Sequence, residues 1–295
     1  MVPLLSKVGL PIVLAFLAVE LTYSWWQNDG KYDRKDTLSN LGGAVVNNVL
    51  SRFVWAALAY AAYSWAYSFA PIKLATTGWL PWAGALLLAD FIWYWEHRFG
   101  HTVRLLWAIH SVHHSSEKFN YSIALRLPWL GGLSRIPFLM PMALLGFSPD
   151  VILLSFSLVL LYQIWVHTEY VGKIGVLEEI LMTPSHHRVH HAVNPQYLDK
   201  NYGGILILWD KLFGTFVREQ ERPIYGLTTP IETHNVVQIN MHGWKEILTL
   251  VRSAPSTQDA IGYILKGPEW SAAGHVIIDK EIATLDEQQP LSAAQ

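Results

Sequence analysis

Long apolar segments separated by short polar loops dominate the first part of the chain. They cover residues 9–26, 41–70, 79–95, 128–147 and 149–170. A helix needs roughly 18 to 20 apolar residues to cross a bilayer, and most of these runs approach or exceed that length. The pattern therefore predicts an all-α fold, an integral membrane helical bundle.

Two of the runs differ from a plain membrane span. Residues 9–26 occupy the position of a signal peptide, but Glu20 interrupts them and no small-residue cleavage site follows, so a first membrane helix is favoured. Prolines and glycines interrupt residues 128–147. We expect this run to be re-entrant and to form a hairpin with 149–170.

The remainder of the chain is more polar, which defines the expected domains. Residues 1–170 form membrane-spanning helices, 171–230 form a cytoplasmic helical cap, and 231–295 form amphipathic helices and a solvated tail. After Tyr170 no apolar run reaches the spanning length. The segment 243–254 instead has the spacing of an amphipathic surface helix.

Composition supports a membrane protein and restricts its chemistry. The 295 residues are 52% hydrophobic and 15% charged, against roughly 25% charged residues in a soluble domain. A net charge of −2 gives no reason to expect nucleic acid as a partner. The chain has no cysteine, so any metal ion must be bound by nitrogen and oxygen ligands.

The positive charges predict an orientation in the membrane. If the runs alternate across the bilayer, every lysine and arginine except Lys7, Arg52, Lys73 and Arg135 lies on the side that carries the histidine motifs. The positive-inside rule places that side in the cytoplasm. We therefore expect the histidine site and the C terminus to face the cytoplasm.

Three motifs, HxxxH, HxxHH and a second HxxHH, contain most of the 13 histidines. The motifs are formed by His97, His101, His110, His113, His114, His187, His190 and His191. Residues three and four apart share one face of a helix, so each motif presents its imidazoles together. Crowded neutral imidazoles are suited to metal ligation, and eight ligands suit two metal ions.

A single histidine near an apolar run is more often structural, but two HxxHH motifs in one chain are not expected by chance. An imidazole site for two metals favours iron, and less strongly zinc or copper. His234, His242 and His275 lie outside the motifs, and we expect them on the surface. The spacing predicts a histidine-rich di-metal site.

The order of these motifs after apolar runs resembles the fatty acid hydroxylase and sterol desaturase superfamily, over about residues 32–230. Within it the chain is most similar to alkylglycerol monooxygenases, through KDTLSNL, DFIWYWEHRFGH, HSVHHSSEKFNYSIALR and TPSHHRVHHAVNPQYLDKNYGG. The resemblance implies two Fe ions bound by the histidines of the three motifs. His186 competes with His187 for a role in the third motif, and the isolated His167 is a further candidate ligand.

Polar residues beside the motifs are candidates for supporting the ligands. Asp90 precedes His97 on the same face of the expected helix, and a carboxylate within a membrane span is a functional candidate. It either orients a ligand imidazole or pairs with a polar neighbour. The flanking residues that either support the site or cap loops are Asn120, Asn194, Asp199 and Asn201.

The resemblance implies an O2-dependent monooxygenase that hydroxylates a lipid C–H bond, with desaturation as the alternative outcome. The substrate that the resemblance implies is an alkylglycerol, reacting at its ether-linked carbon, or alternatively a fatty acid, a sterol or an aminolipid. The sequence contains no cytochrome b5 or dinucleotide-binding motif, so an external electron donor is expected, such as a reduced, tetrahydrobiopterin-like pterin.

Two alternatives come from other classes of protein. A membrane zinc hydrolase would need a general-base glutamate, as in HExxH, and the sequence has no such motif. A non-catalytic metal-binding protein or transporter would need polar residues that continue through the bilayer, whereas these histidines are expected at one face.

Overall fold

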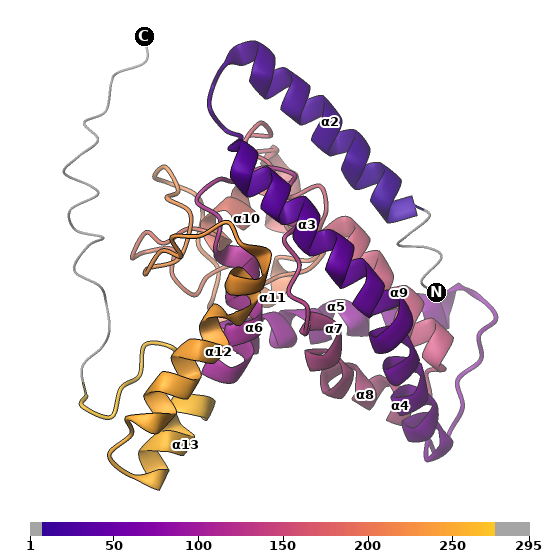
Figure 1. Ribbon diagram of the computed structural model, residues 1–295. Helices are drawn as coiled ribbons and strands as arrows, with labels where there is room; N and C mark the ends of the chain where they lie inside the picture. Colours follow the sequence, from indigo (N-terminus) through magenta and orange to yellow (C-terminus); the bar gives the residue numbers. More distant parts are fainter. Residues whose placement is uncertain (1–7, 275–295) are drawn as a thin grey trace.

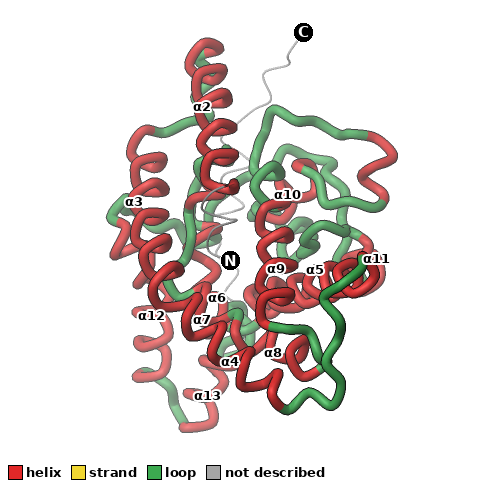
Figure 2. Tube along the Cα trace, turned by 90° about the vertical axis from the view of Figure 1, so that its right-hand side faces the viewer, coloured by secondary structure: helices red, strands yellow, loops and turns green. Residues whose placement is uncertain are grey.

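The computed structural model describes residues 8–274, and this part of the chain consists of helices and loops without a β-strand (Figures 1 and 2). The all-α prediction is therefore confirmed for the described residues, whereas His275 and the expected tail lie outside them. The α-helices are α2 (Leu10–Gln27), α3 (Arg34–Leu50), α4 (Ala56–Ser68), α5 (Trp79–Thr102), α6 (Arg104–His114), α7 (Gly131–Ser134), α8 (Ile136–Leu144), α9 (Pro149–Tyr162), α10 (Pro184–His190), α11 (Leu208–Phe213), α12 (Val236–Arg252) and α13 (Thr257–Leu265).

One long helix has the character of a membrane span. Helix α3 begins where the side chain of Asp33 accepts a hydrogen bond from the backbone N–H of Asp36, and it continues through the π-helical turn Ser51–Trp55 into α4. The resulting helix, Arg34–Ser68, has 35 residues, and only 6% of its most apolar window is buried. The apolar side chains of that window therefore face outward, whereas Tyr63, nearer the end of the helix, is buried.

The other apolar runs do not give further helices of this kind among the described residues. Helix α9 is apolar but has 14 residues. The run 128–147 divides into the short helices α7 and α8, and Pro141 lies within α8. The predicted interruption of this run is confirmed, whereas the expected set of several separate spans is supported for one helix only.

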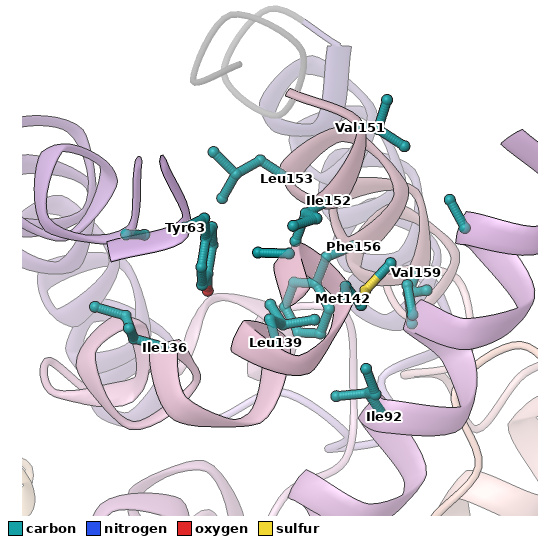
Figure 3. Close-up of a cluster of buried hydrophobic side chains, with 14 of the residues drawn as sticks. Tyr63, Ile92, Ile136, Leu139, Met142, Val151, Ile152, Leu153, Phe156 and Val159 are labelled. Carbon is teal, nitrogen blue, oxygen red and sulfur yellow. The ribbon is translucent and has the colours of Figure 1, made fainter. Parts of the chain in front are cut away.

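A hydrophobic core joins α4, α5, α8 and α9 (Figure 3). Tyr63 of α4, Ile92 of α5, Met142 of α8, and Ile152 and Val159 of α9 are all buried in it. These side chains attract one another through close van der Waals contacts, which add up over the whole core. This core holds the apolar part of α5, so that the histidines at the end of α5 have a fixed position.

Helix α6, which carries the second motif, is held from the opposite side by α12 (Figure 1). Gly243 of α12 permits close approach, because a Cβ at that position would lie 2.6 Å from Cα of Ala108. The buried Arg104 side chain donates hydrogen bonds to main-chain carbonyls at Tyr263 and Trp270, beyond α12. These contacts fix the start of α6 against the C-terminal helices.

Candidate metal centre

The histidines converge on two adjacent clusters, and within each cluster the ligand atoms lie within 4.8 Å of one another. The five-histidine cluster consists of His97, His101, His110, His114 and His190. The four-histidine cluster consists of His113, His167, His187 and His191. The clusters adjoin where the rings of His114 and His191 stack with their centroids 4.2 Å apart.

Helices α6 and α10 each contribute to both clusters. In α6, His110 and His114 are one turn apart and face the five-histidine cluster, whereas His113 faces the other. A step of one residue turns a helical side chain by about 100°. In the third motif His190 alone joins the five-histidine cluster. Each HxxHH motif presents its imidazoles together, as predicted, with neighbouring ring centroids 4.7–5.8 Å apart. The expected single centre is divided, however, because each motif contributes to both clusters.

Main-chain carbonyl oxygens orient four of the clustered rings. Each of these oxygens lies 2.7–3.2 Å from an imidazole Nδ1. The pairs are His97 with Tyr202, His113 with Arg126, His167 with Gln163, and His190 with Lys200. A carbonyl oxygen only accepts hydrogen bonds, so Nδ1 carries the proton of each neutral ring and Nε2 presents a lone pair.

The Nε2 atoms of these rings are directed at one another. The contact between His113 and His167 is the most informative, because both rings donate from Nδ1 to a carbonyl while their Nε2 atoms are 3.1 Å apart. Neither Nε2 has a proton to share, so two lone pairs face each other and repel. His187 approaches the same group, with its Nε2 2.9 Å from that of His167. A cation between these atoms converts the repulsion into ligation, so the residues fit a metal ion.

Burial keeps the clustered imidazoles neutral. Desolvation holds the pKa of each of these histidines well below its usual value near 6.5, and neighbouring imidazoles lower it further. The residues are His110, His113, His114, His187, His190 and His191. Their rings are therefore in the protonation state that binds metal at neutral pH.

The structure distinguishes between His186 and His187. His187 lies in the four-histidine cluster, whereas the ring of His186 lies 5.5 Å from that of Phe216, outside both clusters. Burial lowers the pKa of His186 to about 4, and neither of its ring nitrogens has a hydrogen-bond partner. His167, isolated in sequence, does lie among the clustered histidines.

Asp90 forms hydrogen bonds to the segment 205–209 and not to an imidazole. Its carboxylate accepts hydrogen bonds from the backbone N–H groups of Ile205 and Leu206 and from Nε1 of Trp209. Gly204 is needed beside it, because a Cβ there would lie 2.4 Å from Oδ1 of Asp90. Of the two alternatives, the structure therefore shows pairing with polar neighbours.

The carboxylate nearest to a clustered imidazole belongs to Asp199. Its Oδ1 is 3.7 Å from Nδ1 of His101 and accepts a hydrogen bond from the hydroxyl of Tyr202. The backbone of Tyr202 and Gly203 donates in turn to the buried carboxylate of Asp210. The loop after the third motif is thus held from several sides, and it supplies the carbonyl oxygens that orient His97 and His190.

The three asparagines beside the motifs stabilise loops. Asn201, in the left-handed region with a φ of 58°, donates to the carbonyls of His186 and Val217. Asn194 bonds to the main chain of Arg222 and Ile224, and Asn120 bonds to that of Lys31 and Ser122. Their contacts fit the loop-capping alternative.

The two described histidines outside the motifs differ in exposure. His234 is exposed, as expected. His242 is half-buried, with its Nε2 3.1 Å from the hydroxyl of Ser111 on α6. The expectation of a surface position is wrong for His242, because α12 packs this face against α6.

A buried ion pair behind His113 was not predicted from the sequence. Nη1 of Arg126 lies 3.0 Å from Oδ1 of Asp36 and donates to Oδ1 of Asn40. The carbonyl of the same arginine accepts from His113. One feature of the sequence could have indicated it: Asp36 lies in the motif KDTLSNL and Arg126 in the motif HSVHHSSEKFNYSIALR.

An open cavity of about 490 Å³ lies beyond the four-histidine cluster and is lined by charged residues, including Glu169 and Arg188. The hydroxyl of Tyr225 donates to Glu169, and its ring stacks on Phe119 at 4.9 Å. Phe119 stacks in turn on His167 at 5.9 Å. A continuous series of rings therefore connects this cluster with the wall of a polar cavity.

Residues 82–215, which include every clustered histidine, match the family model described as Fatty acid hydroxylase. This part of the chain is therefore similar to the fatty acid hydroxylase family. The chain is similar to alkylglycerol monooxygenase of Homo sapiens, with 38% identity over 91% of this chain and 60% of the relative. Alkylglycerol monooxygenase of Danio rerio is 37% identical over 92% of this chain and 60% of its own length.

A more distant similarity covers a smaller region. The ornithine lipid hydroxylase OlsE of Rhizobium tropici is 32% identical over 44% of this chain and 40% of its own length. No solved structure matches the chain. The chain spans about 60% of the length of the alkylglycerol monooxygenases that it matches.

Proposed function

We propose that this chain is a membrane monooxygenase that hydroxylates a lipid C–H bond and holds one Fe ion in each histidine cluster. The observation that carries the proposal is the opposed pair of Nε2 lone pairs on His113 and His167 in a buried, all-imidazole setting. The family of residues 82–215 supports iron over zinc or copper. Both clusters consist of histidines alone, and the sequence has no HExxH motif to supply the general-base glutamate of a zinc hydrolase.

The chain's own residues fix the metal positions and exclude water. The clustered histidines would bind both ions through imidazole nitrogens, while the carbonyls of Tyr202 and Arg126 hold His97 and His113 in orientation. When bound, iron would supply the activation of O2 and the removal of hydrogen from the substrate carbon. Seven of the nine clustered histidines are buried, which restricts the access of bulk water to the reacting groups.

We infer that the substrate is an ether lipid of the alkylglycerol type. The two relatives that match about nine-tenths of this chain carry that name. The C–H bond beside an ether oxygen is weakened, because an oxygen lone pair stabilises the developing radical. Insertion of one oxygen atom from O2 gives a hemiacetal, while the other atom leaves as water with two electrons and two protons from the donor. The hemiacetal then separates into a fatty aldehyde and a free glycerol hydroxyl.

The arrangement of the molecule is suited to such a substrate. The outward-facing apolar helix Arg34–Ser68 would lie in the bilayer, which also holds the alkyl chain. The histidine clusters would lie at the cytoplasmic face, where the positive charges of the loops gather. A lipid headgroup at the interface is then level with the metal centre.

The external donor would approach the open charged cavity. The cavity wall is connected to His167 by the stacked rings of Tyr225 and Phe119. A soluble reductant such as a reduced pterin can reach this cavity without crossing the apolar surface. The electrons would then enter at the four-histidine cluster.

An aminolipid hydroxylase is the second candidate, because OlsE is similar over part of the chain. The test supplies the iron-loaded protein with an alkylglycerol, O2 and a reduced pterin, and measures fatty aldehyde. We expect aldehyde from the wild type and from His186→Ala, and none from His187→Ala. Hydroxylation of an ornithine lipid, a fatty acid or a sterol, with no aldehyde from the alkylglycerol, would overturn the proposed substrate. Inactivity toward all four lipids would overturn the proposal that the protein is an oxygenase.

A further inference from the structure

A small cavity lies against His110, where α5, α6 and α7 meet. Its volume of about 20 Å³ gives room for one water-sized group. Leu106, Ile109 and Pro128 supply apolar walls. Gly100 keeps the space beside the imidazole free, because a Cβ there would lie 3.4 Å from Cγ of His110. The cavity is therefore a point at which a small group can approach the five-histidine cluster.

Two opposite charges line this cavity, Glu96 from α5 and Arg135 from the turn between α7 and α8. Their closest atoms, Oε1 and Nε, are 3.8 Å apart, which is too long for a hydrogen bond. Nε of Arg135 is buried and has no hydrogen-bond partner. The pair therefore retains hydrogen-bonding capacity beside a candidate metal ligand.

The arginine is fixed in position by its neighbours. Its guanidinium carbon lies 5.7 Å from the ring centroids of both Trp93 and Phe156, within cation–π range. The side chains of Glu96 and Arg135 are 16% and 24% exposed, so neither is fully buried. A charged pair placed among apolar helices carries a desolvation cost, which a polar ligand would offset.

We propose that Glu96 and Arg135 bind the adjacent hydroxyl groups of a glycerol headgroup and thereby place the ether-linked carbon at the five-histidine cluster. This inference rests on the proposed function and assigns the part of the site that recognises the headgroup. The carboxylate accepts hydrogen bonds from hydroxyl groups, and the guanidinium donates to a hydroxyl or ether oxygen. One hydroxyl fills the cavity, and the second reaches the pair at its accessible side.

The opposite charges favour a neutral, polar headgroup over a singly charged one. Glu96 repels a phosphate or a fatty-acid carboxylate, and Arg135 repels an isolated ammonium group. A zwitterionic amino-acid headgroup could pair with both charges, but its two ions would lose more hydration than two hydroxyl groups do. The experiment therefore includes an ornithine lipid, to compare its binding with that of the alkylglycerol.

The experiment compares three lipids with the same alkyl chain on iron-loaded protein. They are the alkylglycerol, its dimethyl ether without free hydroxyl groups, and an ornithine lipid. Binding is measured without O2, and turnover is measured with O2 and a reduced pterin. The variants are Glu96→Gln, Arg135→Gln and the double variant, with the exposed Glu232→Gln as matched control.

We expect the wild type and Glu232→Gln to bind the alkylglycerol about tenfold or more tightly than the dimethyl ether. Each cavity variant should abolish this preference with iron content unchanged, and KM should rise more than kcat falls. An unchanged preference, or tighter binding of the ornithine lipid, overturns the inference. Selective binding that depends on Glu96 without wild-type turnover of any lipid leaves the inference standing and overturns the proposed function.

Discussion

The two histidine clusters are adjacent but differ in what surrounds them. The five-histidine cluster borders the small cavity that Glu96 and Arg135 line, close to the apolar helices. The four-histidine cluster is connected through Phe119 and Tyr225 with a much larger, open and charged cavity. Under the proposed function, this difference would divide the roles, with lipid approaching the five-histidine cluster and the electron donor approaching the four-histidine cluster.

The clusters also differ in what holds them in place. His97 and His190 of the five-histidine cluster depend on carbonyls in the loop after the third motif, which Asp210 anchors. His113 of the four-histidine cluster depends on the carbonyl of Arg126, which the long helix Arg34–Ser68 fixes through Asp36. Each cluster can therefore be disturbed through its own support.

Loss of one ligand from either cluster should have the largest effect. We expect His190→Ala and His113→Ala each to reduce the iron content from about two ions to about one and to lower activity below about a thousandth of wild type, because both ions act together. Elemental analysis and aldehyde formation measure the two effects. His186→Ala is the control, and iron loss in that variant would contradict the assignment of the clusters.

Removal of the support behind His113 should have the next largest effect. Asp36→Ala leaves Arg126 as a buried, unpaired charge, and we expect the free energy of unfolding to fall by about 3–5 kcal/mol. Denaturant unfolding in detergent measures this change. Asp33→Ala removes a helix cap on the same segment and should cost about 1 kcal/mol. Equal losses in both variants would show that the buried pair has no special role.

How much of this centre the sequence predicted depends on how local each feature is. The spacing of His97 and His101 predicted that both lie on one face of a helix, because residues four apart are one helical turn apart. The division of α6 between two clusters did not, because it depends on where α10 and His167 pack. Likewise, the partner of Asp36 is Arg126, far away in the chain, and spacing carries no information about such a contact.

The apolar pattern was informative about helices but less so about membrane spans. It predicted the helical fold, and the prolines of residues 128–147 predicted the interruption that separates α7 from α8. It did not distinguish apolar side chains that face outward from those that pack in the core of Figure 3. That distinction depends on tertiary contacts, as does the packing of His242 against Ser111.

Removal of the support behind the five-histidine cluster should reduce the free energy of unfolding by less than removal of the ion pair does. Asp210→Ala removes the acceptor of two buried backbone N–H groups, at Tyr202 and Gly203. We expect a loss of about 2–3 kcal/mol in unfolding free energy and preferential loss of the iron bound by His97 and His190. Native mass spectrometry of the loaded protein follows the iron. A variant that retains both ions at wild-type affinity would contradict this role of the loop.

For each proton taken up, a change of one pH unit should alter the free energy of unfolding less than Asp36→Ala or Asp210→Ala does. Histidines of both clusters contribute to this pH dependence. The fold keeps the imidazoles of His110 and His191 neutral by depressing their pKa, whereas the unfolded chain takes up protons near pH 6.5. Stability of the iron-free protein should therefore fall as the pH decreases below about 6.5, by about 1.4 kcal/mol per pH unit for each additional proton bound by the unfolded chain. Denaturant midpoints between pH 8 and pH 5 measure this, and a constant midpoint would contradict the buried, neutral clusters.

The central claim is that the two clusters are two separate metal positions. An anaerobic titration of the metal-free protein with Fe(II), followed by iron analysis after gel filtration, tests it most directly. We predict saturation at two equivalents in the wild type and in His186→Ala, and at one equivalent in His187→Ala. Saturation of the wild type at a single equivalent would contradict the account.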